Sequence, residues 1–213
     1  VHILDAKRGD AIEVEIVDIA PDEYGYTVIA PGFGFLRDVF TEPYIVNWKL
    51  TRQGAVSDGM PGVTIPYEAF PGSIGVMPGN PEIDKILKRE ANLAGAGGAV
   101  LGPSGPGALP AELCGEGGKF EQRCLRTIPP RENGGNMDVQ QQQVGTRMLF
   151  PCFIDGCGLF VGDVHYAQGD GEVSGTAIEM GSVTTLRVVK IHKGKGKSMV
   201  MPATKGNDQI IDM

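Results

Sequence analysis

The sequence predicts a mainly β fold of many short strands, joined by long loops rich in glycine and proline, with one clear helix at about residues 81–94. The chain of 213 residues contains 32 glycines and 15 prolines, spread between apolar runs. Together they exceed a fifth of the chain, against roughly 12% in an average protein, which indicates many turns. Alternating stretches predict the strands, and a single stretch carries the signals of a helix.

The clearest strand is Ala11–Ile19. Ile12, Val14 and Ile16 fall on one face of it, and acidic side chains dominate the other, as expected of a half-buried strand. The other expected strands are Tyr44–Leu50, Val63–Tyr67, Gly72–Met77 and Thr184–Ile191.

The helix is expected to begin after Asn80, which suits an N-cap, with Pro81 at the first helical position. An apolar stripe that includes Ile83 and Ile86 then repeats at helical spacing, and Gly95 ends it. The uncharged stretch that follows, Gly95–Ala111, is expected to be a lid-like loop.

Charge and hydropathy exclude several partners. The formal net charge is −7, which argues against a nucleic-acid partner and against an anionic membrane surface. No uncharged apolar run approaches the length of a membrane span, and no signal peptide opens the chain. The four cysteines form no C-x-x-C pair, and we interpret them as reduced thiols of a cytoplasmic protein.

Both ends of the chain are strand-like. Val1–Leu4 and Gln209–Met213 are apolar runs, and the first residue is not methionine. We therefore expect the natural protein to continue at both ends, and we expect other segments or subunits to cover these edges.

The stretch Val161–Met180 concentrates ionisable side chains between apolar runs. Asp163 and His165 have strand spacing, so they are expected on one face, and a turn near Gln168 would lead into a return strand that opens at Glu172. Such a hairpin would bring Asp163, His165 and a carboxylate of the return strand to one ion or one water. The alternative is a polar hairpin whose acids face solvent.

A second source of ligands follows two prolines. Asn136 and Asp138 stand two residues apart at the end of an Asn-Gly-Gly-Asn run, which allows unusual backbone angles. The alternative is a tight hairpin of the Asn-Gly type. If the run does supply ligands, Asp138 is the residue that would complete a set with Asp163 and His165.

Three blocks of the sequence match a known family, in the family's order. They are Pro129–Asp138 (PPRENGGNMD), Gly162–Glu172 (GDVHYAQGDGE) and Ser174–Glu179 (SGTAIE). The chain therefore resembles the acetamidase/formamidase family of amide hydrolases. The resemblance implies one β-rich amidase domain over residues 1–213, arranged as a β-sandwich of two sheets. It also implies hydrolysis of a small primary amide, formamide before acetamide, by a homo-oligomer, for which we expect a trimer or larger.

The roles of the residues are argued from chemistry. An unactivated amide needs a deprotonated water, a polarised carbonyl and a protonated leaving amine, which favours metal-assisted attack by water. Asp163, His165 and Asp138 or Glu172 are the expected metal ligands, and zinc suits a site with histidine better than calcium does. Glu172 or Glu179 is the expected general base. His165 is also counted as catalytic, and the expected substrate-binding residues are Asn136 and Gln168.

Two other mechanisms or functions stay open. Cys152 or Cys157 could serve as a nucleophile, although neither has an activating residue beside it in the sequence. The chain could also be a non-enzymatic β-sandwich binding module whose acidic loop holds calcium for rigidity.

Overall fold

The computed structural model describes residues 1–98, 110–205 and 210–212, and within them the fold is mainly β, as expected. The strands that it describes form one sheet of 11 strands, whose main path runs β11-β10-β7-β1-β9-β8-β5-β6. The strands are β1 (Ala11–Ile29), β2 (Tyr44–Thr51), β3 (Gly54–Val56), β4 (Thr64–Ile65), β5 (Phe70–Gly75), β6 (Gly134–Asn136), β7 (Arg147–Pro151), β8 (Phe160–His165), β9 (Glu179–His192), β10 (Ala203–Lys205) and β11 (Ile210–Asp212).

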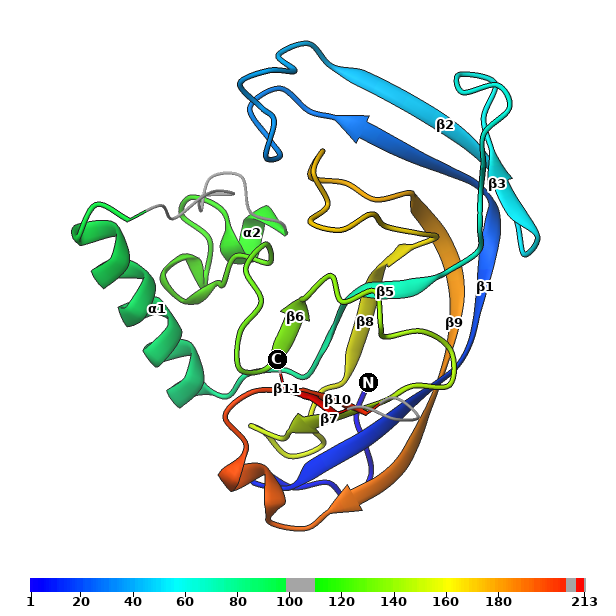
Figure 1. Ribbon diagram of the computed structural model, residues 1–213. Coiled ribbons are helices and arrows are strands. Elements are labelled where there is room, and N and C mark those ends of the chain that lie inside the picture. The colour runs from blue at the N-terminus through cyan, green and yellow to red at the C-terminus, as the bar shows by residue number, and fades with distance from the viewer. Residues whose placement is uncertain (99–109, 206–209, 213) are drawn as a thin grey trace.

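Most strands are short, as expected, but the described strands form one sheet where two were expected, and two of the strands are long. β1 and β9 contain 19 and 14 residues and pair antiparallel along nearly their whole length. Their register shifts at three places, between Glu13 and Val14, between Ile16 and Asp18, and between Pro21 and Gly25. Such bulges bend a strand pair, so one sheet can curve around a core without dividing. Figure 1 shows both strands curving along one side of the molecule, with the helix α1 on the opposite side.

The main core lies inside this curve. Ile12, Val14 and Ile16 are fully buried, as the alternation of β1 predicted, and they pack in one cluster with Met148 and Phe150 of β7. Burying side chains of this size stabilises the fold by about 1.5–3 kcal/mol each. The ladders of β1 with β7 and β9 are therefore held by the core of the protein.

A second, smaller core supports the far end of β8. Tyr166 is fully buried, packs with Trp48, Leu50 and Ile178, and donates a hydrogen bond of 2.7 Å from its hydroxyl to the carbonyl of Thr51. The residue directly after β8 is thus fixed between β2 and the start of β9. This fixes the chain where the candidate functional residues lie.

The expected helix is present as α1 (Asn80–Gly95). The N-cap is Gly79 rather than Asn80, and no side chain caps the helix, so that part of the expectation is wrong. Ile86 is the buried residue of its apolar stripe, and Glu90 forms ion pairs with Arg126 and Arg131. The shorter helices are α2 (Ala111–Cys114), η2 (Glu121–Arg123) and η3 (Lys195–Ser198).

The cysteines are paired, which corrects the interpretation as reduced thiols. Cys114 bonds to Cys124 and Cys152 bonds to Cys157, so none of the four is a free thiol. Turns between the partners bring their Cα atoms to 5.6 Å and 4.5 Å, which sequence spacing does not reveal. No helix among the described residues is both long and apolar enough to cross a membrane. Most of the expected lid-like loop, residues 99–109, lies outside the described residues.

Candidate metal centre and active site

The candidate site lies where β8 ends and β9 begins. His165 is the last residue of β8 and pairs across the ladder with Glu179, the first residue of β9. The strand that returns to β8 begins at Glu179 and not at the expected Glu172, because residues 166–178 form a loop and Glu172 has a positive φ of 44°. This loop is also hydrogen-bonded to β1: the hydroxyl of Thr176 donates to the carbonyl of Val28 at 2.8 Å.

His165 is rigidly held. Its side chain is 1% exposed, and its ring meets Phe70 edge to face at a centroid distance of 5.2 Å. Gly72 of β5 leaves room for the ring, since a Cβ there would lie 2.7 Å from the Cε1 and Nε2 atoms. The close approach of β5 to the imidazole therefore requires glycine at this position.

Gln168 orients the imidazole. Its Oε1 atom lies 2.8 Å from Nδ1 of His165, and its Nε2 atom donates to the carbonyl of Asp138 at 3.5 Å. With Oε1 as acceptor, Nδ1 carries a proton, and the lone pair of a neutral ring lies on Nε2. A partner of this kind fixes the tautomer that a metal ligand or a proton acceptor needs.

Three carboxylates surround Nε2 of His165, and that of Glu172 completes a cluster of four acids. Nε2 lies 3.4 Å from Glu179, 3.6 Å from Asp163 and 4.0 Å from Asp138. Two sets of side chains have ligand atoms within 4.8 Å of one another: Asp138, His165 and Glu172 form one, and Asp163, His165 and Glu179 form the other. The structure thus brings together every carboxylate and the histidine expected from the sequence, and both sets have the composition of a metal site.

Backbone strain is concentrated in this cluster. Five described residues other than glycine have a positive φ, and three of them are the cluster members Asp138 (51°), Asp163 (53°) and Glu172 (44°). A left-handed conformation costs such residues of the order of 1–3 kcal/mol each, and it persists only where the surroundings enforce it. The fold therefore holds these carboxylates in place against a local preference.

The carboxylates shift one another's pKa values. Burial, and then the charge of Asp138, raise the pKa of Glu172 to about 7. Burial also raises the pKa values of Asp138 and Glu179, whereas the bond to His165 lowers that of Asp163. Ionised carboxylates this close together repel one another, so a bound proton or cation stabilises the cluster.

In the histidine the same surroundings favour the charged form of the side chain. Burial by itself would lower the pKa of His165, but Asp163, Glu179 and Asp138 outweigh it and raise the pKa to about 9. The protonated imidazole of His165 therefore offsets part of the negative charge of the cluster.

Ser73 is a site residue that sequence reasoning missed. Its hydroxyl lies 3.2 Å from Oδ2 of Asp163 and 2.9 Å from Oδ1 of Asn136, so it connects the cluster to Asn136. Asn136 also donates to the carbonyl of Ile128 at 3.1 Å and does not contact the histidine directly. The only sequence signal for Ser73 was its position inside an expected strand, which carries no chemistry.

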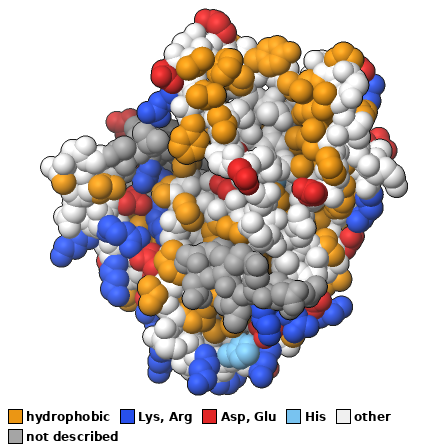
Figure 2. All heavy atoms as spheres, in the orientation of Figure 1, with side chains coloured by type: hydrophobic (Ala, Val, Ile, Leu, Met, Phe, Trp, Pro, Cys, Tyr) orange, Lys and Arg blue, Asp and Glu red, His pale blue; other side chains and the backbone are white. Residues whose placement is uncertain are grey.

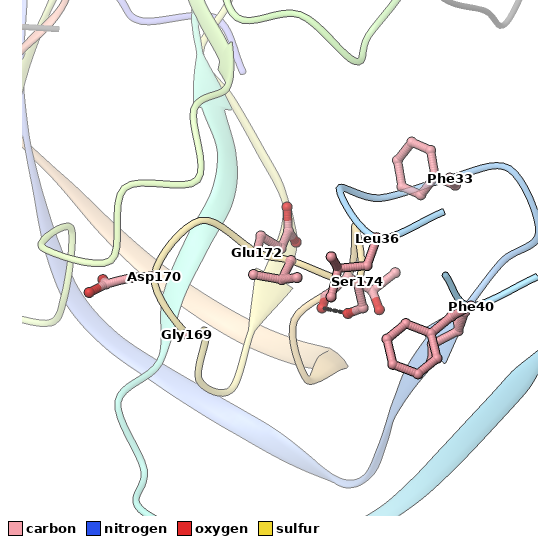
Figure 3. Close-up of a pocket in the computed structure, with 10 residues that line it drawn as sticks. Phe33, Leu36, Phe40, Gly169, Asp170, Glu172 and Ser174 are labelled. Carbon is pink, nitrogen blue, oxygen red and sulfur yellow. Dashed lines mark hydrogen bonds between the residues drawn. The ribbon is translucent and has the colours of Figure 1, made fainter. Parts of the chain in front are cut away.

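Pockets flank the cluster on more than one side. One of about 330 Å³ lies against Glu172, between the segment that joins β1 to β2 and the loop 169–176 (Figure 3). Another, of about 400 Å³, is lined by Asp163 and Glu179 together with residues of β1 such as Tyr24. A small molecule could therefore reach the cluster from the Glu172 side or from the Asp163 side.

The fold and the site together define a mainly β protein with a buried cluster of side chains that could hold a metal ion. The chain belongs to the Acetamidase/Formamidase family, whose family model matches residues 1–207. It is 32% identical to an acetamidase of Mycolicibacterium smegmatis over 216 aligned residues, and 31% identical to a formamidase of Methylophilus methylotrophus over 205. These alignments cover 89% and 90% of this chain but 52% and 50% of the relatives, so the chain spans about half their length.

Solved structures agree with the family assignment. A gamma lactamase from Delftia acidovorans superimposes with a TM-score of 0.85 at 30% identity, covering 98% of this chain and 55% of that one. An acetamidase from Bacillus halodurans gives 0.68 at 26% identity, covering 95% and 53%. The β-rich architecture is thus that of solved members of this family.

Proposed function

We propose that this protein hydrolyses the C–N bond of a small primary amide to a carboxylate and ammonia. The observation that supports the proposal best is the buried His165 in a cluster of four carboxylates, in a chain similar to an acetamidase and a formamidase. Formamide is the first substrate to test and acetamide the second. A non-enzymatic calcium-stabilised module is not favoured, because the curated relatives named above are both amide hydrolases by name.

A divalent metal ion is part of this proposal. The donor set fits one, because an imidazole held by Gln168 faces Asp163 and Asp138, and Glu179 or Glu172 is close enough to complete the set. A nitrogen ligand among carboxylates favours zinc over calcium. When bound, the ion would supply Lewis acidity, which polarises a carbonyl and lowers the pKa of water.

Glu172 is the better candidate for the general base. Its carboxyl group lines a pocket, and its pKa of about 7 suits a group that takes up and returns a proton near neutral pH. Water attacks the carbonyl carbon while Glu172 accepts its proton. The C–N bond then breaks as the same proton passes to the departing nitrogen. Glu179 is the alternative base, although the N–H of Ala177 holds one of its oxygens at 2.9 Å.

The thiol mechanism lacks a free thiol, because Cys152 and Cys157 are bonded to each other and are buried in the main core. Water is therefore the nucleophile in this proposal. Asn136 and Gln168 remain the proposed substrate-binding residues, Asn136 through Ser73 at the edge of the cluster and Gln168 beside His165.

Ammonia release tests the proposal. Metal-loaded, full-length protein is incubated with formamide and acetamide, from which ammonia is measured. A γ-lactam is added to the series, since a gamma lactamase is among the similar structures. Opening of the lactam ring releases no ammonia, so this reaction is followed as loss of the lactam. We expect turnover of at least one open-chain amide and loss of turnover after chelation. Absence of turnover on every amide, by a protein that needs its metal only for thermal stability, would favour the binding module.

We also propose that the protein assembles into a homo-oligomer, a trimer or larger. Figure 2 shows hydrophobic side chains gathered over the segment between β1 and β2. In this segment Phe35 is 78% exposed and Val39 is exposed, and Ile45 at the start of β2 is exposed as well. Exposed apolar groups of this kind are typical of association surfaces. A cytoplasmic location stays a prediction, and it no longer has the support of reduced thiols.

A further inference from the structure

The pocket beside Glu172 has an apolar wall that hydrolysis of formamide does not use. One side of it consists of Ile29, Phe33, Leu36 and Phe40, from the end of β1 and the segment that follows. The opposite side is the loop 169–176. Figure 3 shows Leu36 close to Glu172, with Phe33 and Phe40 beyond it. A carboxylate of the candidate site thus stands at one end of an apolar pocket of about 330 Å³.

The two walls of the pocket are hydrogen-bonded and closely packed against each other. The N–H of Phe35 donates to the carbonyl of Val173 at 2.9 Å, so the aromatic segment hydrogen-bonds to the loop that carries Glu172. Gly34 approaches this loop so closely that a Cβ would lie 2.6 Å from the carbonyl oxygen of Ser174. Gly175 has a φ of 82° and would likewise place a Cβ 2.5 Å from the ring of Phe33. The pocket is therefore built by specific contacts between the two segments.

The aromatic wall is incompletely covered within the described residues. Phe33 and Leu36 are each 42% exposed and Phe40 is 49% exposed, although all three line a concave surface. A hydrocarbon group placed there would remove apolar surface from water on both sides, which is favourable. Formamide has only hydrogen on its carbonyl carbon, and acetamide has a single methyl group, so neither can occupy this space.

We propose that this pocket binds the hydrocarbon part of the substrate, so that the protein prefers primary amides with an apolar acyl chain of several carbons over formamide and acetamide. The inference rests on the proposed amide hydrolysis. The amide group would lie at Glu172 and His165, and the acyl chain would extend towards Leu36 and Phe40. Each methylene buried in the pocket is expected to raise kcat/KM by about fourfold.

The test uses metal-loaded, full-length protein and a series of formamide, acetamide, butyramide and hexanamide, with ammonia as the readout. Phe40→Ala and Leu36→Ala remove parts of the wall, and the pair guards against one of them failing to fold. Phe35→Ala is the matched control, because Phe35 belongs to the same segment and is exposed but does not line the pocket.

We expect kcat/KM to rise along the series in the unmodified protein. Each wall variant should lower the ratio of kcat/KM for hexanamide to that for formamide by about tenfold. Phe35→Ala should leave this ratio unchanged. Turnover of formamide with no gain along the series, or an equal loss on all substrates in the wall variants, overturns the pocket inference and leaves the hydrolase proposal standing. Inactivity on every amide overturns the hydrolase proposal, and the inference falls with it.

Discussion

At the scale of single residues, the site depends on one buried imidazole. Removing it by His165→Ala takes away the nitrogen around which the carboxylates gather, so we expect loss of bound metal and a drop in turnover of at least a hundredfold. Metal content by elemental analysis and ammonia release measure the two effects. His192→Ala is the matched control, because His192 pairs with Glu13 on the far end of the β1–β9 ladder. A folded His165→Ala protein with near-normal metal and turnover would contradict the central site.

Substitutions of Glu172 and of Glu179 are expected to have different effects. Glu172→Gln should lower turnover by a factor of roughly 10²–10⁴ with the metal retained, because the side-chain amide of glutamine cannot accept a proton as a carboxylate does. Glu179→Gln should lower metal content first, since the carboxylate of Glu179 lies closest to Nε2 of His165, at 3.4 Å. The two variants are compared in the same metal and ammonia assays. Full activity in both would remove these residues from the mechanism.

At the scale of elements, β5 approaches β8 closely, and the ring of His165 fits there because Gly72 of β5 has no side chain. Gly72→Ala puts a methyl group 2.7 Å from the imidazole, so we expect displacement of the ring and loss of activity of about a hundredfold or more. Gly162→Ala, on β8, is the control, because a Cβ there meets nothing within 4 Å. Thermal unfolding of both variants separates a local effect from general destabilisation. Equal activity of the two variants would show that the close approach is not required.

Glu90 of helix α1 forms ion pairs with the segment before β6. Arg131, whose side chain is 7% exposed, and Arg126 both donate to Glu90. Burial would raise the pKa of Glu90, but these bonds outweigh it and lower the pKa below its usual value. We expect Glu90→Gln to reduce the free energy of unfolding by about 2 kcal/mol near neutral pH, because the buried Arg131 loses its carboxylate partner and keeps only carbonyl acceptors.

The pH dependence of this effect has a definite sign. A carboxyl group whose pKa is lowered by folding stabilises the protein fully above its unfolded pKa, and this contribution is lost as the pH falls through the folded pKa. The difference between the native protein and Glu90→Gln should therefore be constant near neutral pH and shrink below about pH 4. Denaturant titration at several pH values measures it. Asp84→Asn, which breaks an exposed pair with Arg123, is the control and should cost less than about 1 kcal/mol at any pH.

At the scale of the whole molecule, assembly is the feature to test. Apolar side chains such as Val39 and Ile45 stand exposed beside the pocket segment, and burying them between subunits would be favourable. We expect light scattering on the full-length protein to give a mass of a trimer or more. Val39→Asp together with Ile45→Asp should lower that mass if this surface takes part. A monodisperse, active monomer would contradict the proposal.

Much of the fold was readable from local patterns. Ile12, Val14 and Ile16 alternate in the sequence and are buried together, and α1 lies within a residue of its expected bounds. The number of sheets was not readable, because it depends on bulges in β1 and β9 that bend both strands together. A bulge is set by the register between strands far apart in the chain, and the pattern of a single strand does not contain it.

The sequence by itself determined the chemistry available to this protein. It supplied Asp163 and His165 in one motif, Asp138 in another and Glu179 in a third, and these motifs carried the family resemblance, which the comparisons confirmed. Only the tertiary structure decided how they meet. The strand that returns to β8 begins only at Glu179, and the loop before it bonds to β1, where Thr176 contacts Val28, 148 positions away in the chain. The left-handed backbone of the acids and the apolar pocket at Glu172 have the same origin: each depends on contacts between distant segments, and spacing along the chain does not encode such contacts. The pairing of the cysteines depends on the turns between the partners, which their spacing does not reveal either.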